Sequence, residues 1–222
     1  MSKVKILSVL AIALAVVLVL SSCNFTPGSM TLPTSTPDPN AATAEPVEPT
    51  PSPTPLTQKG IVAIIRLWHD WKDADVKVLD EALALFKVEY PNVILKLTSV
   101  PTEELKAKFE GEATSVDLIL GPAGWGQEWL DAYIIQEVTL MVDAETGWAD
   151  TWTPEALAAC KAGEALVSTP INANGKFEVA YLTQTASYQN KTAAWELMMF
   201  FTRTNIQKML IDAGQKGILK AQ

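Results

Sequence analysis

The stretch from Ile61 to Tyr90 constrains the fold most strongly, because it joins two patterns that predict different elements. Its first part, IVAIIRLW, is an apolar run without Gly or Pro, which is typical of a strand buried on both faces. Its second part has apolar residues at steps of three and four, which predicts one buried stripe on a helix. The stripe is formed by Val76, Leu79, Leu83, Phe86 and Tyr90. Asp73 is predicted to cap this helix and Pro91 to end it.

The next segments predict a parallel sheet. Val93 to Val100 alternates with period two and indicates a strand. Thr102 is predicted to cap a helix that runs to Ala113, and Val116 to Leu120 is predicted to be a short buried strand. This βαβαβ order predicts an α/β fold with a mostly parallel sheet flanked by helices.

The rest of the chain predicts shorter elements and one long helix. We expect a helical turn over Gln127 to Ala132 with Trp129 packed inward, a short helix starting at Pro154, a brief extended piece over Ala165 to Pro170, a turn over Ile171 to Lys176, and a strand over Phe177 to Gln184. The last helix is predicted to run from an Asn190 cap to Ala213, and to be buried on more than one side.

Residues 1–22 are predicted to be a signal peptide rather than part of the fold. Lys3 and Lys5 precede an apolar core, Ile6 to Leu20, that is too short for a typical membrane span. Leu20-Ser21-Ser22-Cys23 resembles the bacterial lipobox, in which cleavage leaves the Cys as a lipidated N-terminus. The resemblance implies a lipoprotein, acylated at Cys23 with chains such as palmitate, that is anchored in the cell envelope and faces the extracytoplasmic side. The alternative for Cys23 is a thiol packed in a core, and the sequence does not choose between membranes.

Residues 23–59 are predicted to hold the lipidated Cys and a linker. Nine of the fourteen prolines of the chain lie between Asn24 and Gln58, interleaved with Thr and Ser. This composition cannot bury a core and favours polyproline II, at about 3.1 Å per residue. The linker therefore holds a domain, residues 60–222, on the order of 100 Å from its anchor. A proline-rich recognition motif is the weaker alternative, since no basic residue flanks the prolines.

Charge and cysteine content exclude several classes of function. The formal net charge is −8, and it becomes −10 when cleavage removes Lys3 and Lys5. This balance disfavours nucleic acid as a partner. Cys160 is the one cysteine left after Cys23, so the chain has no disulfide framework, and we expect Cys160 to be a packed thiol rather than a nucleophile.

Two blocks of sequence, one early in the chain and one near its end, resemble one family of binding proteins. The first comprises Leu67-Trp68-His69-Asp70-Trp71 with Glu81-Ala82-Leu83 and Glu89-Tyr90-Pro91, then Val116-Asp117-Leu118-Ile119 with Gly121-Pro122, and the second comprises Asn190-Lys191-Thr192-Ala193-Ala194-Trp195-Glu196-Leu197 with Gln207-Lys208-Met209-Leu210. They are similar to extracellular sugar-binding lipoproteins, the maltose-binding-protein-like solute receptors (family 1) of ABC importers. The resemblance implies the type II periplasmic-binding-protein fold. It also implies a small-molecule solute such as a sugar, ABC importer membrane subunits as partners, no cofactor and no enzymatic activity.

The length departs from that family, whose members are much longer and close two lobes over the ligand. Thr153 to Pro170 resembles the start of the crossing to the second lobe, and Phe177 onward resembles a segment much nearer the C-terminus. We therefore expect a single-lobe version that lacks most of the second lobe. A half-cleft without its closing wall should bury less of a ligand and bind it more weakly.

The candidate ligand-binding residues lie in two loops that follow predicted strands. Trp68, His69, Asp70 and Trp71 follow the first strand, and Gly124 and Trp125 follow the third. Open α/β sheets bind ligands at the carboxyl ends of their strands. Tryptophan rings stack on the C–H faces of sugars while polar groups bond the hydroxyls.

Other interpretations of these residues stay open. The tryptophans alternatively pack a core or a lobe interface. His69 with Asp70 and Asp73 is a weak metal signal, and Asp70 with Asp117 is a weak glycosidase pair. GxSxG and HExxH motifs are absent, which disfavours an enzyme. The competing function is a degenerate lipoprotein that acts as a protein-interaction module, which predicts an exposed apolar patch near Ala165 to Asn174.

Overall fold

The computed structural model describes residues 60–221. The predicted signal peptide, Cys23 and the linker lie outside the described residues. Within residues 60–221, none of the helices combines the length and the apolar character that a membrane crossing requires.

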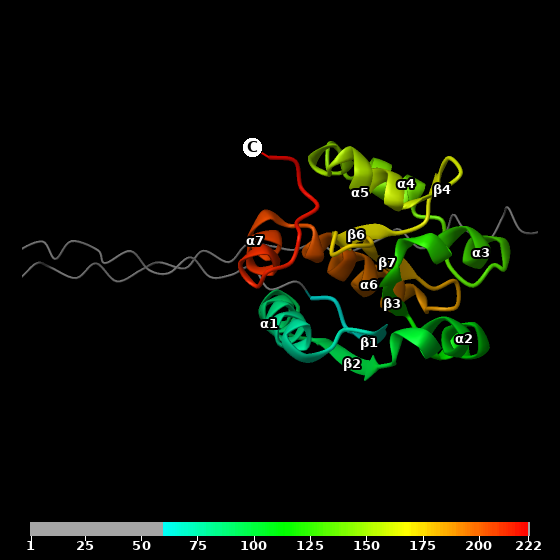
Figure 1. Cartoon of the computed structure of the whole chain (residues 1–222). Helices are drawn as coiled ribbons and strands as arrows, with labels where there is room; N and C mark the ends of the chain where they lie inside the picture. Colours follow the sequence, from blue (N-terminus) through cyan, green and yellow to red (C-terminus); the bar gives the residue numbers. More distant parts are fainter. Residues whose placement is uncertain (1–59, 222) are drawn as a thin grey trace, which may run out of the picture. The chain divides into compact units, whose positions relative to one another are not determined.

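A five-stranded sheet forms the centre of the fold, in the order β2-β1-β3-β7-β6 (Figure 1). The strands are β1 (Ala63–His69), β2 (Val93–Ser99), β3 (Leu118–Pro122), β6 (Thr169–Asn172) and β7 (Glu178–Leu182). β1 pairs in parallel with β2 and β3, whereas β7 pairs antiparallel with both β3 and β6. Because β6 is antiparallel to β7, it runs in the same direction as β1, β2 and β3. Only β7 runs against the other four strands. The predicted α/β fold with a mostly parallel sheet is confirmed.

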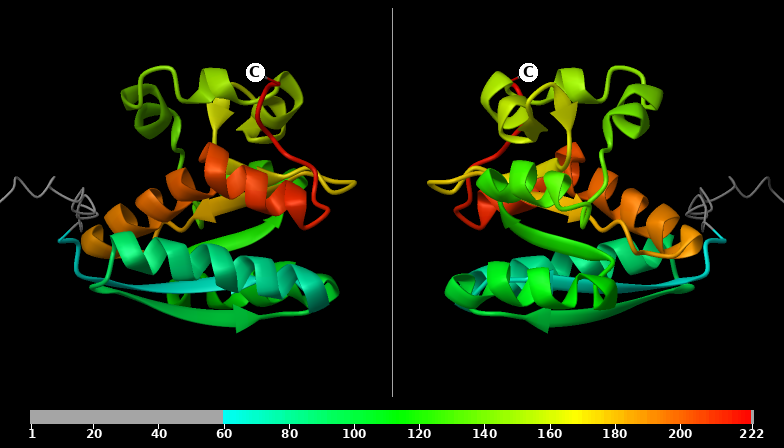
Figure 2. Two further views of the ribbon diagram at one scale, coloured as in Figure 1. Left: turned by 90° about the vertical axis from the view of Figure 1, so that its left-hand side faces the viewer. Right: turned by 90° about the vertical axis from the view of Figure 1, so that its right-hand side faces the viewer.

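Helices cover both faces of this sheet (Figure 2). The helices α1 (Asp73–Glu89), α6 (Tyr188–Phe201) and α7 (Thr204–Asp212) lie on one face, and α2 (Thr102–Glu112) lies on the other. The smaller elements are α3 (Gly126–Asp131), α4 (Thr139–Ala144), α5 (Pro154–Ala159) and a hairpin of β4 (Lys161–Ala162) with β5 (Ala165–Leu166). Short 3-10 turns lie at Ala113–Ser115, Ala123–Trp125 and Ala149–Thr151. α5 packs against β6 and so extends the core past that edge of the sheet.

A five-residue turn, residues 173–177, joins β6 to β7. β6 ends and β7 begins at the edge of the sheet where β1 and β3 also end, because β6 runs in their direction and β7 against it. The short turn occupies the position at which the sequence predicted a missing lobe, between Pro170 and Phe177. The carboxyl ends of β1, β2, β3 and β6 therefore lie at one edge of the sheet, and the short turn leaves that edge from β6.

Several local predictions are confirmed. Pro91 follows the end of α1, and α5 begins with Pro154, whose preceding Thr153 side chain accepts a hydrogen bond from the Ala156 amide. Trp129 in α3 is fully buried. Cys160 is buried, and burial raises the pKa of its thiol to about 12, so it is a packed thiol.

Other local predictions are wrong. Asp73 does not cap α1, since Lys72 holds the cap position and Asp73 is the first helical residue, with a φ of 50°. Thr102 is likewise the first residue of α2 rather than its cap. Ile64 is 41% exposed, so β1 is open on one face at its start instead of buried on both.

The predicted last helix is two helices. Ser187, not Asn190, caps α6, and the helix ends at Phe201 before α7 starts at Thr204. The break is stabilised by the buried Gln207 side chain, whose Nε2 donates to the Phe201 carbonyl at 2.8 Å and to the Ile171 carbonyl at 2.9 Å. A buried helix end needs such partners for its free carbonyls.

Candidate functional site

A small polar hollow lies at the carboxyl edge of the sheet. Its volume is about 230 Å³. Clefts that bind small molecules typically have about 300–1,000 Å³, so this hollow suits a single small group and not a long oligosaccharide. It is lined by Asp70, Trp71, Lys72, Asp75, Asn172, Asn174, Glu178 and Gln215.

A chain of hydrogen bonds crosses the base of this hollow. The Trp71 indole N–H and the Asn172 amide both donate to the Glu178 carboxylate, the latter at 3.1 Å. Asn172 Nδ2 also donates to Gln215 Oε1 at 3.2 Å, and Gln215 Nε2 donates to Asp75 Oδ1 at 2.9 Å. The hollow is therefore held by the β1 loop, the start of α1, both sides of the β6–β7 turn and the segment after α7.

Glu178 has an unusual environment for a carboxyl group. Burial, reinforced by the nearby charge of Asp70, raises the pKa of Glu178 to about 7, although hydrogen bonds from Trp71 and Asn172 oppose this rise. An unfolded glutamate has a pKa of about 4.3. The folded protein therefore holds a proton on Glu178 over a pH range in which the unfolded chain has lost it.

This difference predicts a pH-dependent stability. Because the folded-state pKa is raised, ionisation of Glu178 should destabilise the fold progressively as the pH rises from about 4.3 to about 7. We expect Glu178→Gln, which cannot ionise, to be more stable than the wild type at pH 8 and similar at pH 4.5. Urea unfolding at both pH values measures this, with Glu164→Gln, at a residue in the β4–β5 turn, as the matched control. A variant that gains no stability at pH 8 relative to pH 4.5 would contradict the assignment.

The structure brings together only some of the predicted ligand-binding residues. Asp70 and Trp71 line the hollow. Trp68 is buried, with the Lys108 ammonium of α2 5.1 Å from its ring centroid, and it does not line the hollow. Gly124 and Trp125 also lie outside it.

The glycines on either side of the loop after β3, Gly121 in β3 and Gly126 at the start of α3, make close contacts inside the protein, whereas Gly124 in the loop makes none. A Cβ on Gly121 would lie 2.9 Å from the Trp125 ring, and one on Gly126 would lie 2.7 Å from Val167. Trp125 also packs on Trp129, with ring centroids 5.0 Å apart. These glycines therefore allow packing of the protein on itself.

His69 is buried, and burial lowers its pKa despite the nearby charges of Asp70 and Asp80. Its Nδ1 has no hydrogen-bond partner among the described residues. No three His, Cys, Asp or Glu side chains converge to hold a metal ion anywhere in residues 60–221. The weak metal signal of the sequence thus has no support in the part of the chain that the structure describes.

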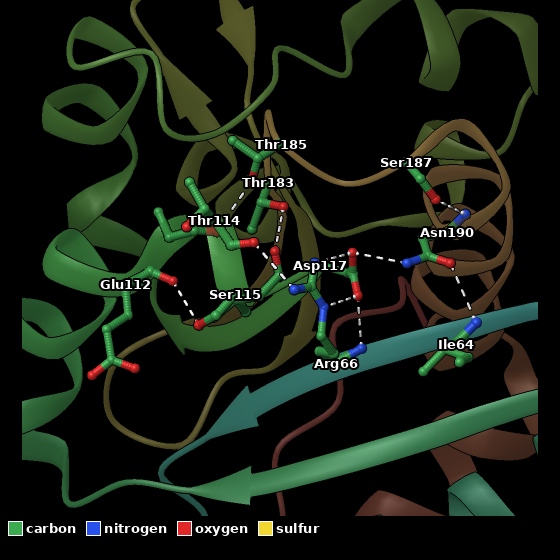
Figure 3. Close-up of polar contacts among 12 residues, drawn as sticks. Ile64, Arg66, Glu112, Thr114, Ser115, Asp117, Thr183, Thr185, Ser187 and Asn190 are labelled. Atoms are coloured by element: carbon green, nitrogen blue, oxygen red, sulfur yellow. Dashed lines mark hydrogen bonds and ion pairs between the residues drawn. The ribbon is translucent and has the colours of Figure 1, made fainter.

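Asp117 is part of a separate polar cluster (Figure 3). Arg66 donates to it through Nε at 2.8 Å, Nη2 at 2.9 Å and its backbone N–H at 2.9 Å, and Asn190 Nδ2 donates at 3.2 Å. Burial alone would raise the pKa of Asp117, but the bonds from Arg66 and Asn190 outweigh it and hold the pKa below its usual range. Asp117 precedes β3, whereas Asp70 follows β1 and lies four residues beyond Arg66, about 13 Å along the strand. The two carboxylates therefore do not form a glycosidase pair.

Sequence reasoning missed six of the eight residues that line the hollow, Lys72 and Asn174 among them. Asp75, Asn172, Glu178 and Gln215 were not among the predicted ligand-binding residues. The bond between Trp71 and Glu178 joins residues 107 positions apart, and the bond between Gln215 and Asp75 joins residues 140 apart. No local motif marks such partners.

Comparisons with known proteins identify the fold. No family model matches the sequence, and no curated protein matches it. The maltose-bound MalE3 protein of T. maritima superposes with a TM-score of 0.63 at 11% identity, covering 72% of this chain and 82% of that chain. The ligand-free maltodextrin-binding protein MalE1 of L. casei BL23 superposes with a TM-score of 0.62 at 12% identity, covering 72% of this chain and 80% of that chain. At these identities the likeness to the two proteins is one of fold.

Proposed function

We propose that this protein is the solute-binding component of an ABC sugar importer, in a one-lobed form anchored to a membrane on its extracytoplasmic side. One observation carries the proposal. The fold shared with two sugar-binding proteins presents a polar hollow at the carboxyl edge of its sheet, where open α/β folds bind their ligands.

The sequence outside the described residues supports the same proposal. The lipobox-like Leu20 to Cys23 and the proline-rich linker would place the domain outside the cytoplasmic membrane while leaving it free to meet solutes and membrane subunits. The predicted ligand-binding residues Asp70 and Trp71 supply a carboxylate and an indole at the hollow.

Other hollows are larger, such as one of about 580 Å³ between α1 and α7. An open groove of about 670 Å³ is a further alternative place for a ligand. It lies between Trp148, Arg203 and Lys220. None of the predicted ligand-binding residues lines it. We favour the smaller hollow because of its position at the ends of the strands.

The competing function, a protein-interaction module, is not favoured. It required an exposed apolar patch near Ala165 to Asn174. All four residues of β6 are buried in the sheet, and Leu166 and Val167 are buried as well. The edge of the sheet at the short β6–β7 turn is thus polar at the hollow, and the apolar side chains beside the hollow are buried.

A thermal-shift experiment on the full-length protein in detergent tests the proposal. A ligand that binds only the folded state stabilises it by about 2.7 kcal/mol at a hundredfold excess over Kd, which for a chain of this size raises Tm by roughly 5–10 °C. We expect a concentration-dependent rise with one class within a panel of mono- and oligosaccharides. Trp71→Phe, which lacks the indole N–H, should reduce the rise. Trp68→Phe, at a buried tryptophan outside the hollow, should keep it. A cooperative melt that no sugar moves would refute the proposal.

A further inference from the structure

The charges that line the hollow are unbalanced. Three carboxyl groups face it, those of Asp70, Asp75 and Glu178, against the single amine of Lys72. None of these three carboxyl groups forms an ion pair with a Lys, Arg or His of residues 60–221, and Lys72 forms none either. The excess of carboxyl groups over amines therefore involves several side chains of the hollow and not a single one.

The polar partners inside the hollow are neutral. Glu178 receives its hydrogen bonds from an indole and an amide, and Asp75 receives one from the Gln215 amide. Asp70 accepts no hydrogen bond from the described residues and is half-buried. His69, which lies near Asp70, is kept neutral at pH 7 because burial lowers its pKa.

Two carboxyl groups of the same chain, that of the buried Asp117 and that of the half-buried Glu178, show what a cation changes. Asp117 is paired with the Arg66 guanidinium, and its pKa lies below the usual range. Glu178 has no cationic partner among residues 60–221, and its pKa lies well above that range. A positive charge placed in the hollow would give its carboxyl groups the ion-pair partner that Arg66 provides to Asp117.

The hollow also offers unused acceptors to a ligand that carries donors. The side-chain N–H groups of Trp71 and Asn172, and one N–H of Gln215, are already bound to carboxylate or amide oxygens. Among the described residues, Asp70 and Asp75 Oδ2 remain free to accept, beside free donors on Lys72, Asn174 and Gln215. An alkylammonium group has three donors and no acceptor, and it bonds carboxylates more strongly than a hydroxyl does. A metal ion fits less well, because no three ligating side chains within the described range converge on one point.

We infer that the hollow binds a protonated amino group, so that the solute is an amine-bearing monosaccharide rather than a neutral sugar. This inference rests on the proposed function, since it specifies the solute of the same site. The three carboxyl groups would surround the ammonium group, and the sugar ring would extend toward the open side of the hollow. The small volume agrees with one ring or less.

Calorimetric titration and thermal shift of the full-length protein test the inference with matched pairs of sugars. The pairs are glucosamine with glucose, galactosamine with galactose, and mannosamine with mannose, and N-acetylglucosamine is a neutral control of larger size. We expect at least one amine to bind roughly tenfold or more tightly than its neutral partner, as expected for hydrogen bonds to a charged group.

Two isosteric variants show whether the carboxyl groups cause the preference. Asp70→Asn and Asp75→Asn each remove a charge and should reduce the preference for the amine several-fold, and Asp70→Asn breaks no hydrogen bond within the described residues. Lys72→Gln, which removes the one positive charge of the same hollow, should keep or increase the preference.

The outcomes separate the inference from the proposed function. If a neutral sugar binds as tightly as its amine, or if only neutral oligosaccharides bind, the inference is overturned and the proposed function stands. If Asp70→Asn and Asp75→Asn leave the preference for the amine unchanged, the inference is overturned as well. If no sugar binds, both fail together.

Discussion

Replacing Asp117 with alanine is expected to destabilise the fold by about 1.5–3 kcal/mol, because the change removes a buried charged acceptor of hydrogen bonds from Arg66 and Asn190. The Asp117 side chain is fully buried, whereas that of Arg66 is 35% exposed. The carboxylate accepts bonds that tie β1, the start of β3 and α6 together, through Arg66 and Asn190. Its loss would leave the Arg66 backbone N–H and the Asn190 amide without their acceptor.

Urea unfolding at pH 7 measures this loss. Asp212→Ala is the matched control, since it removes a carboxylate from the exposed pair with Lys208, and such pairs contribute about 1 kcal/mol or less. A loss for Asp117→Ala no larger than that of the control would contradict the prediction.

The same ion pair predicts a loss of stability in acid. Because the folded-state pKa of Asp117 is lowered, its contribution is fully present above the unfolded-state pKa of about 3.9. The contribution is lost as the pH falls further, through the folded-state value. As the pH falls below about 3.9, the free energy of unfolding of the wild type should therefore approach that of Asp117→Ala.

Replacing Trp129 with alanine is expected to cost about 3–5 kcal/mol, since it removes a large, fully buried side chain and leaves a cavity. The ring packs edge-on against Phe109 and Tyr181, with centroids 4.7 and 5.1 Å away. Its indole N–H also donates to Glu110 at 2.9 Å. The residue therefore joins α3 to α2 and to β7.

Thermal or urea unfolding of three variants tests the role of Trp129. Trp129→Phe retains most of the aromatic packing and should lose clearly less than Trp129→Ala. Tyr188→Ala removes an aromatic side chain that is 84% exposed, and should change the stability little. Equal stability of Trp129→Ala and Tyr188→Ala would rule out the packing argument.

Most of the central sheet is predictable from sequence because short segments specify its strands and helices. The apolar stripe of α1, the alternation of β2 and the Thr153-Pro154 start of α5 each depend on a few neighbouring residues. The errors lie where distant residues intervene. Gln207, buried beside Ile171 and Phe201, ends α6 twelve residues before the predicted stop at Ala213.

The sequence predicts where the candidate site lies but not which residues line it. The loop after β1 does lie at the carboxyl edge of the sheet, where a βαβ order puts it. The second loop, with Trp125, packs on Trp129 and Gly121 instead of lining the hollow. A tryptophan beside glycines is equally suited to a core and to a ligand, and only the positions of its neighbours decide between them.

The sequence alone determined the α/β class, the order of the main strands and helices, and the edge of the sheet at which a ligand site belongs. These depend on hydrophobic period and chain connectivity, which are local or topological properties. Only the tertiary structure decided which charges meet at that edge. Glu178 and Asp75 reach the hollow from segments about a hundred residues apart, and the pKa of Glu178 depends on burial and on Asp70. Desolvation and Coulomb interactions depend on distance in space, and separation along the chain does not give that distance.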